Sequence, residues 1–247
     1  MTPRIAAAAL AGALSLCGPA TSAEPPALRV ILVGDSTMAP RNGYGDALCQ
    51  RFTAAVSCLN LGVNGRSSLS YRAEGLWDKM LAQLGSPPGP AATYVLTQFG
   101  HNDQPGKPGR STDLATEYPV NLAAYIDDLR SRGANPVLVT PLTRRSFKGG
   151  TLDNDLLPWA DAMRGVAAAR KVPLIELNAR SAAAVQAMGQ EEADTLAEVP
   201  PPVGNAPPGK FDRTHLGAKG AQVFARIMAR ELGAQLPALA AALKPEP

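Results

Sequence analysis

The chain has 247 residues, of which 45% are hydrophobic, so it can bury one sizeable core in a single α/β domain. The net charge of +3 is too small to indicate a nucleic-acid-binding protein, and no basic run is interleaved with aromatic residues. Beyond the N-terminal region, every apolar stretch is far shorter than the roughly 20 residues that a membrane span requires, so we expect no such span.

The first residues predict a secretory signal peptide. Arg4 precedes an apolar run from Ile5 to Cys17, and the small residues Thr21–Ala23 follow. A positive start, a short apolar run and a small-residue exit are typical of exported proteins. We therefore predict a signal peptide over 1–23, one domain over 24–247, and a secreted or periplasmic location. The alternative is a hydrophobic helix that belongs to the domain.

Export would place the remaining cysteines, Cys49 and Cys58, in an oxidising compartment. A disulfide between them would tie the end of one predicted helix to the start of the next strand. The alternative is two buried thiols that never meet, because spacing alone does not give their distance.

Five apolar segments read as strands that are covered on both faces, because their hydrophobic runs are continuous rather than alternating. These strands are expected at Leu28–Val33, Val56–Leu61, Ala92–Phe99, Pro136–Thr140 and Pro173–Leu177. Segments of helical period follow in alternation, at Gly45–Phe52, Tyr71–Leu84, Tyr118–Arg132, Leu157–Lys171 and Ala218–Leu232. This alternation predicts an α/β fold with a parallel sheet and helices on both faces.

Two Pro/Gly-rich segments, Gln104–Thr112 and Val199–Lys210, break this pattern and are predicted to be loops. Each lies beside polar residues at the end of a strand or before a helix. In parallel α/β proteins, the loops at the carboxyl ends of the strands carry the functional site. The sequence therefore predicts a functional site at this edge of the sheet.

A serine ends the first predicted strand, where "ILVGDST" turns from apolar to polar. Gly34 permits a tight turn, and the short side chains of Asp35 and Ser36 can bind local backbone groups. Ser36 is thus a candidate nucleophile at the carboxyl edge of the sheet. The alternative is an ordinary polar turn, in which these residue types are common.

A serine nucleophile needs a base, and the chain has only two histidines. His215 follows Asp212 by three residues, so the carboxylate can orient one ring nitrogen while the other accepts the Ser36 proton. The alternative role for Asp212 is to cap the last helix, with His215 in its first turn.

Donors for an oxyanion are expected at two further strand ends. Gly65 follows the second strand and offers a backbone N–H, and Asn102 follows the third strand and offers an amide. Both residue types are common in turns, so each signal is weak alone. Their convergence with Ser36 and His215 on one sheet edge favours a catalytic site.

The four blocks resemble the SGNH (GDSL-like) hydrolase superfamily, in the order "GDS", "NGRS", "GHND" and "DRTH". The forms "GDSTMA", "NGRSS", "FGHNDQ" and "DRTHLGAKGA" are similar to the rhamnogalacturonan acetylesterase branch. A departure is Tyr44, where that branch leads us to expect tryptophan in a wall of the site. The resemblance implies a three-layer α/β/α, flavodoxin-like fold with a central five-stranded parallel sheet.

The resemblance also implies a serine esterase that removes acetyl groups from plant polysaccharide, above all rhamnogalacturonan in pectin. Ser36 would attack the acetyl carbonyl, Asp212 and His215 would complete the triad, and Ser36, Gly65 and Asn102 would bind the oxyanion. No metal or organic cofactor is expected, and we expect a monomer. The alternatives are an esterase of acetylated xylan, aryl or lipid esters, and a non-catalytic carbohydrate-binding protein.

Four further residues are candidates for substrate binding. His101 could contact substrate or act as a second base, and the alternative is that it supports the Asn102 loop. Arg66 and Arg144 are expected on a cationic rim that suits a polyanion, although solvated loop charges are the plainer interpretation. Trp159 either stacks on a sugar ring or packs in the core. The other basic residues expected near this rim are Lys107, Arg110, Arg145 and Lys148.

Overall fold

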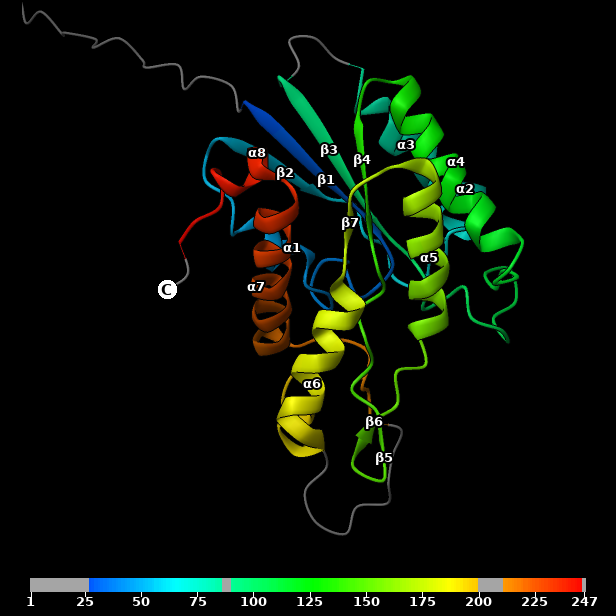
Figure 1. The fold of residues 1–247 in the computed structure, drawn as a ribbon, viewed down its shortest axis with the longest axis vertical. Coiled ribbons are helices and arrows are strands. Elements are labelled where there is room, and N and C mark those ends of the chain that lie inside the picture. The colour runs from blue at the N-terminus through cyan, green and yellow to red at the C-terminus, as the bar shows by residue number, and fades with distance from the viewer. Residues whose placement is uncertain (1–26, 86–89, 200–210, 246–247) are drawn as a thin grey trace, which may run out of the picture.

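A computed structural model describes residues 27–85, 90–199 and 211–245 of the chain (Figure 1). The predicted signal peptide lies outside the described residues, as does the predicted loop Val199–Lys210 apart from its first residue.

The centre of the fold is a sheet of five strands in the order β2-β1-β3-β4-β7. Every neighbouring pair in this sheet is parallel. The strands are β1 (Leu28–Gly34), β2 (Val56–Asn60), β3 (Ala92–Gln98), β4 (Asn135–Val139) and β7 (Leu174–Ile175). All five strands expected from the apolar runs are therefore confirmed, with ends that differ by a few residues.

Helices cover both faces of the sheet (Figure 1). One layer contains α1 (Gly45–Cys49), α6 (Leu177–Asp194), α7 (Ala218–Gln235) and α8 (Pro237–Ala240). The other contains α2 (Ser70–Ala73), α3 (Leu76–Ala82), α4 (Glu117–Ser131) and α5 (Leu157–Arg170). The expected three-layer α/β/α architecture is confirmed.

The side chains of strand β1 pack into two separate hydrophobic cores, because successive side chains of a strand point to opposite faces. Val30 and Leu32 belong to the core that includes residues of α7, and Ile31 and Val33 belong to the core that includes residues of α4. All four side chains are wholly buried. A continuous apolar run is what a strand covered on both faces requires.

Three local features differ from the expectation. The helix predicted at Tyr71–Leu84 is two helices, because Gly75 adopts a left-handed conformation with φ of +71° between them. Helix α6 was not predicted, and it is kinked at Gly189. Strands β5 (Phe147–Lys148) and β6 (Thr151–Leu152) form a short antiparallel hairpin that was also not predicted.

Cys49 and Cys58 form a disulfide, with their Cα atoms 5.3 Å apart. It joins the last residue of α1 to β2, as the oxidised alternative required. Within residues 27–85, 90–199 and 211–245, no helix combines the length and apolar character needed to cross a bilayer.

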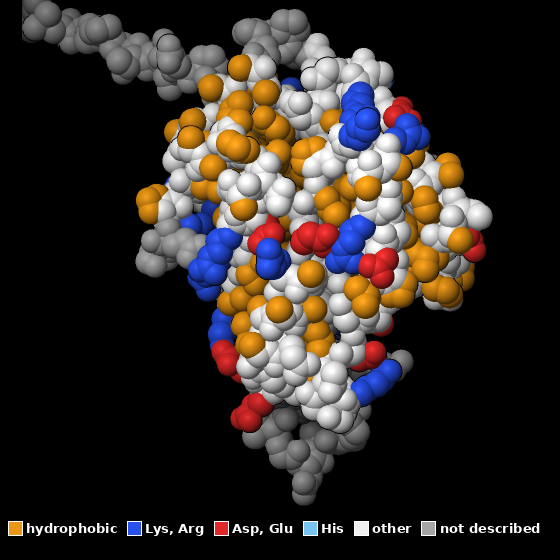
Figure 2. Space-filling view, in the orientation of Figure 1, with side chains coloured by type: hydrophobic (Ala, Val, Ile, Leu, Met, Phe, Trp, Pro, Cys, Tyr) orange, Lys and Arg blue, Asp and Glu red, His pale blue; other side chains and the backbone are white. Residues whose placement is uncertain are grey.

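The outer face of α5, α6 and α7 carries mixed charge. Figure 2 shows acidic and basic side chains interspersed among hydrophobic ones over this face. Ion pairs on these helices include Arg164–Glu176, at 2.8 Å, and Arg180–Glu231, also at 2.8 Å. Interspersed charges of both signs produce little net field, so this face offers no electrostatic preference for an anionic polymer.

Candidate active site

Ser36 is the second residue after β1, at the predicted carboxyl edge of the sheet. A tight turn forms here because the N–H groups of Met38 and Ala39 both donate to the carbonyl of Asp35, at 3.2 and 3.0 Å. Gly34 is required before this turn, since a Cβ atom at that position would lie 2.7 Å from the carbonyl oxygen of Gln98. The turn leaves Ser36 5% exposed.

Ser36, His215 and Asp212 form a hydrogen-bonded row. His215 Nε2 lies 2.8 Å from Ser36 Oγ, and His215 Nδ1 lies 2.7 Å from Asp212 Oδ2. The other carboxylate oxygen of Asp212 accepts the backbone N–H of Thr214 at 2.8 Å and that of His215 at 3.0 Å. This is the order of groups that activates a serine hydroxyl.

The carboxylate of Asp212 is kept ionised. Burial would raise its pKa, but hydrogen bonds from His215 and Thr214 and the attraction of His215 hold the pKa below its ordinary value. An ionised Asp212 accepts a hydrogen bond from the Nδ1–H group of His215 and thereby leaves Nε2 unprotonated, so that Nε2 can accept a hydrogen bond from the Ser36 hydroxyl. The helix-cap alternative is not observed, because α7 begins at Ala218, after a Gly217 N-cap.

Ser36, Gly65 and Asn102 carry three potential oxyanion donors. Gly65 adopts a left-handed φ of +76°, which glycine tolerates best. Asn102 donates one amide hydrogen to the carbonyl of Arg66, at 3.0 Å, and retains a second. The backbone hydrogen bonds found in the described part of the chain include none from the N–H of Ser36 or Gly65. All three residues line one cavity.

A buried carboxylate joins the two loops that carry these donors. Asp103 Oδ1 accepts the hydroxyl of Ser68 at 2.5 Å, the N–H of Ser68 at 3.0 Å and the hydroxyl of Thr112 at 3.2 Å. Burial raises the pKa of Asp103 to about 6 despite these hydrogen bonds. Its main partner, Ser68, belongs to the loop of Gly65.

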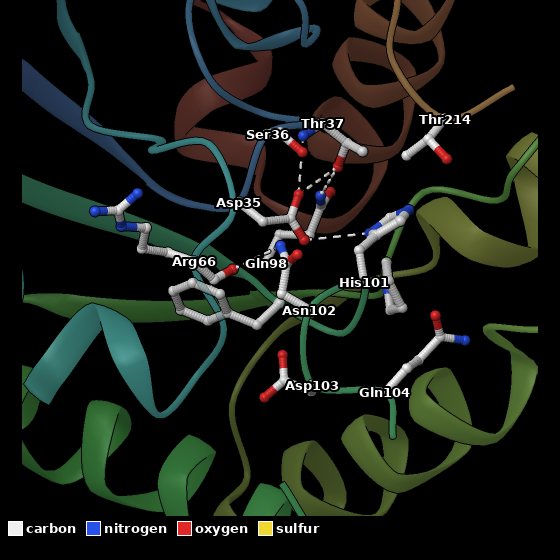
Figure 3. A network of polar contacts seen from close by, with 12 residues as sticks. Asp35, Ser36, Thr37, Arg66, Gln98, His101, Asn102, Asp103, Gln104 and Thr214 are labelled. Carbon is white, nitrogen blue, oxygen red and sulfur yellow. Dashed lines mark hydrogen bonds and ion pairs between the residues drawn. The ribbon is translucent and has the colours of Figure 1, made fainter. Parts of the chain in front are cut away.

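A chain of buried polar groups lies beneath Ser36 (Figure 3). Asp35 Oδ1 accepts the N–H and the hydroxyl of Thr37, at 2.9 and 2.8 Å, and Oδ2 lies 3.2 Å from His101 Nδ1. Gln98 donates to the Thr37 hydroxyl, and Tyr44 donates to Gln98, both at 2.7 Å. Tyr44 is therefore a buried member of this chain. It does not line the cavity, whereas the resemblance led us to expect this position in a wall of the site.

Asp35 is the charged centre of this chain. Burial would raise its pKa, but the attraction and hydrogen bond of His101 and the hydrogen bonds of Thr37 hold the pKa below its ordinary value. His101 is 2% exposed and lines the cavity, and its Nε2 atom has no partner within the described residues. The structure thus places His101 both as a support beneath the site and as a cavity residue.

The cavity around Ser36 has a volume of about 360 Å³ and a cationic wall. Lys107, Arg110 and Arg144 all line it. Lys107 also donates to the carbonyl of His101, and its pKa is lowered by burial and by the nearby Arg144. The full lining is Ser36, Asn42, Asn64, Gly65, His101, Asn102, Lys107, Arg110, Arg144, Asp212, Thr214 and His215.

Several residues expected near the substrate do not line this cavity. The guanidinium of Arg66 binds Glu74, at 2.6 and 2.9 Å. Trp159 is 4% exposed and packs edge-on against Tyr118, so it belongs to the core. Lys148 is exposed and pairs with Asp153, and Arg145 is wholly buried.

The sequence reasoning missed Asn42, Asn64 and Thr214, which line the cavity. The carbonyl of Asn42 accepts the N–H of Leu216 at 2.9 Å, next to His215, and Asn42 Oδ1 is buried without a partner in the described part of the chain. The only local signal was the Asn42–Gly43 pair, which reads as a turn.

Comparison with known proteins assigns the chain to a family. A profile of the GDSL-like Lipase/Acylhydrolase family matches residues 32–223, a range that contains Ser36, Gly65, Asn102, Asp212 and His215. The chain is 34% identical over 222 residues to the rhamnogalacturonan acetylesterase RhgT of Bacillus subtilis, covering 85% of this chain and 92% of RhgT.

Solved structures share the fold. A Bacillus subtilis protein, YxiM, superposes with a TM-score of 0.69 at 22% identity; the match covers 83% of this chain and 56% of that longer one. The acetyl xylan esterase AlAXEase superposes with a TM-score of 0.58 at 19% identity, covering 81% of this chain and 97% of that one. Identities this low show likeness of fold alone.

The family profile spans most of the chain, and the relative RhgT is matched over nearly its whole length. The central sheet, its helical layers and the row of Ser36, His215 and Asp212 are the parts that an acyl hydrolase of this kind requires. The chain belongs to the GDSL-like lipase/acylhydrolase family, on the branch that includes RhgT, and it is a carboxylic ester hydrolase.

Proposed function

We propose that this protein is a polysaccharide acetylesterase that acts on acetylated rhamnogalacturonan in pectin. The name of the relative RhgT supports the class of substrate. The cationic wall of the cavity supports the choice of an acidic polymer, because Lys107, Arg110 and Arg144 lie on the same cavity as Ser36. This wall is the observation that carries the proposal.

In the proposed reaction, Ser36 Oγ attacks the acetyl carbonyl while His215 Nε2, 2.8 Å away, takes the hydroxyl proton. The C–O bond to the sugar then breaks, and His215 returns the proton to the departing sugar oxygen. Water, deprotonated by His215, then attacks the acetyl-enzyme; the bond between the acetyl carbon and Ser36 Oγ breaks, His215 returns the proton to Oγ, and acetate leaves. Asp212 holds the ring and stabilises its charged form throughout.

Negative charge develops on the carbonyl oxygen in both halves of the reaction. We assign its stabilisation to the N–H groups of Ser36 and Gly65 and to the second amide hydrogen of Asn102. Asp103 and Ser68 keep the loops of Gly65 and Asn102 together, at 2.5 Å between Ser68 Oγ and Asp103 Oδ1. Donors that are held in place before the reaction are the most effective.

The cationic wall suits a uronate carboxylate near the acetyl group. Arg144 is itself held, by Asp155 and by the Thr214 hydroxyl at 3.2 Å, so it presents its charge at a fixed place. Arg110 lies 3.4 Å from the carbonyl of Gly65, beside the oxyanion donors. A lipid chain would meet these charges without compensation, which disfavours a lipase.

The test compares acetate release from acetylated rhamnogalacturonan oligosaccharides and from acetylated xylan, which is neutral. Raising ionic strength from about 10 mM to about 150 mM should lower kcat/KM on the acidic substrate selectively, because screening shortens the range of charges from about 30 Å to about 8 Å. The Lys107→Gln/Arg110→Gln double variant should lower the ratio of acidic to neutral kcat/KM by about tenfold, about 1.4 kcal/mol.

Lys148→Gln is the matched control, because it removes an exposed cation that lies outside the cavity. It should leave the substrate ratio unchanged. A ratio that responds neither to salt nor to the double variant would reject the pectin preference and favour acetylated xylan.

We also propose that the enzyme is exported. The disulfide between Cys49 and Cys58 supports this, because such bonds persist in oxidising compartments. Mass spectrometry of protein collected from the culture medium and the periplasm would test both export and cleavage after Ala23. Recovery of full-length chain in the cytoplasm, with both thiols free, would refute the proposal.

A further inference from the structure

Arg145 binds the backbone of the whole segment from Asp212 to His215. Its N–H donates to the carbonyl of Arg213, at 2.9 Å. Its guanidinium donates to the carbonyls of Asp212 and His215, at 3.0 and 2.8 Å, and to that of Thr214, at 3.4 Å. The guanidinium and the backbone N–H of Arg145 together thus donate hydrogen bonds to the carbonyl of every residue in the segment.

The segment depends on these contacts because it has no regular secondary structure of its own. It lies between the undescribed residues 200–210 and α7, which begins at Ala218. Backbone carbonyls away from water need hydrogen-bond donors, and neither a helix nor the sheet supplies donors to this partly buried segment. Side-chain bonds within the segment run from Asp212 to its own neighbours, so they shape the turn without anchoring it to the sheet.

Arg145 is well placed to be the anchor. It follows β4, and its side chain is wholly buried. Its own carbonyl accepts Gln190 of α6 at 3.0 Å, which fixes it from a second element. A planar guanidinium presents several donors in a rigid fork, so it can hold several carbonyls in a fixed mutual arrangement, whereas an ammonium cannot.

The surrounding charges favour a cation at this position. Asp194 lies in the same region and binds Arg213 through two contacts of 2.9 Å. Burial lowers the pKa of Arg145 to about 10, with the attraction of Asp212 and Asp194 opposing the decrease. The guanidinium therefore remains charged near neutral pH.

We propose that Arg145 is a positioning residue, which holds Asp212 and His215 at the distance from Ser36 that the reaction needs. It acts through four backbone carbonyls and makes no contact with the cavity. Its neighbour Arg144 lines the cavity, so two adjacent arginines serve opposite sides of the same loop. The proposal concerns ester hydrolysis itself and is independent of the preferred polysaccharide.

The test measures hydrolysis of p-nitrophenyl acetate by Arg145→Met and Arg145→Lys. Arg145→Met should lower kcat by about 10²-fold and change KM by less than about threefold, because small displacements of reacting groups cost about this much in rate. Arg145→Lys should recover part of the loss, since it keeps the charge but lacks the fork. Inactivation of Ser36 by an organophosphonate should slow in parallel with kcat.

The control variant is Arg164→Met. Arg164 is half-buried and binds Glu176 at 2.8 Å, but it lies on α5 and outside the cavity. This variant should lose stability without losing kcat. Proton NMR gives a direct readout, because a ring N–H bound to a carboxylate resonates far downfield. The Asp212–His215 signal should weaken in Arg145→Lys, while the Asp35–His101 signal should persist as an internal reference.

Three results would overturn the proposal. The first is an Arg145→Met protein that is folded and retains kcat within about threefold of the wild type. The second is a loss of rate that Arg164→Met reproduces at equal loss of stability. The third is failure of both Arg145→Met and Arg145→Lys to fold, which would make Arg145 a folding residue and not a positioning one.

Discussion

Replacing Asp103 by asparagine should change how stability depends on pH. Asp103 is buried, and its pKa in the folded protein is about 6, against 3.8 for the ordinary group. Between these two values, the folded state binds more protons than the unfolded state, so the wild type gains stability from Asp103 as pH falls. The gain begins near pH 6 and is complete below the unfolded pKa.

The size of this effect follows from the shift. A difference of about two pKa units corresponds to about 3 kcal/mol. Asp103→Asn keeps one acceptor oxygen for Ser68 but does not titrate. The free energy of unfolding of the wild type, minus that of Asp103→Asn, should therefore rise by about 2.4 kcal/mol between pH 7 and pH 4, and by about 3 kcal/mol in full at still lower pH. Asp35 and Asp212 have lowered pKa values and act in the opposite direction, but they are present in both proteins and cancel.

The assay is urea denaturation of both proteins at a series of pH values. Circular dichroism monitors unfolding, and each titration gives a free energy of unfolding. Taking the difference at each pH removes contributions that the two proteins share. A difference that stays flat would show that Asp103 titrates alike in the folded and unfolded states. A difference that falls toward acid would show that its hydrogen bonds outweigh burial. Either outcome would refute the reasoning.

The remaining predictions concern the nucleophile, the oxyanion site and the disulfide. Ser36→Ala should abolish hydrolysis of p-nitrophenyl acetate while leaving the melting temperature near that of the wild type; retained activity would exclude Ser36 as nucleophile. Asn102→Ala should lower kcat by about 10²–10³, the usual effect of losing one oxyanion donor, and a loss below threefold would limit Asn102 to shaping its loop. Cys49→Ser/Cys58→Ser should lower the free energy of unfolding by about 2–3 kcal/mol, given the short loop of nine residues in separation that the bond closes; denaturation under oxidising conditions measures this, and equal stability would show that the bond is dispensable.

The strands could be predicted because a strand buried on both faces needs an uninterrupted run of apolar residues, which is visible in the sequence. Val30–Val33 are apolar without interruption, and such a run requires cover on both faces of the sheet. The sequence of helix α6 has no comparable apolar pattern. It is rich in alanine, which fits a helix but marks no buried stripe, and Gly189 interrupts its period.

The site was predictable where chemistry itself restricts the residue type. A hydroxyl, an imidazole and a carboxylate at strand and loop ends pointed to Ser36, His215 and Asp212. The environment of basic residues was not predictable, because Arg144 and Arg145 are adjacent and chemically identical. One lines the cavity and the other is wholly buried, and only the three-dimensional path of the segment after β4 separates them.

The polar chain beneath Ser36 has a consequence for protein engineering. Tyr44, Gln98, Thr37 and Asp35 each satisfy a neighbour, so replacing any one leaves a dehydrated donor or acceptor at the next position. Lys107 and Arg110, by contrast, stand on a loop that water can reach from the cavity side. Libraries that aim at new acyl or sugar preferences should therefore randomise residues 104–110 and leave both Thr112, which binds Asp103, and the polar chain beneath Ser36 intact. Changes of selectivity would then arise without disturbing the geometry of bond cleavage.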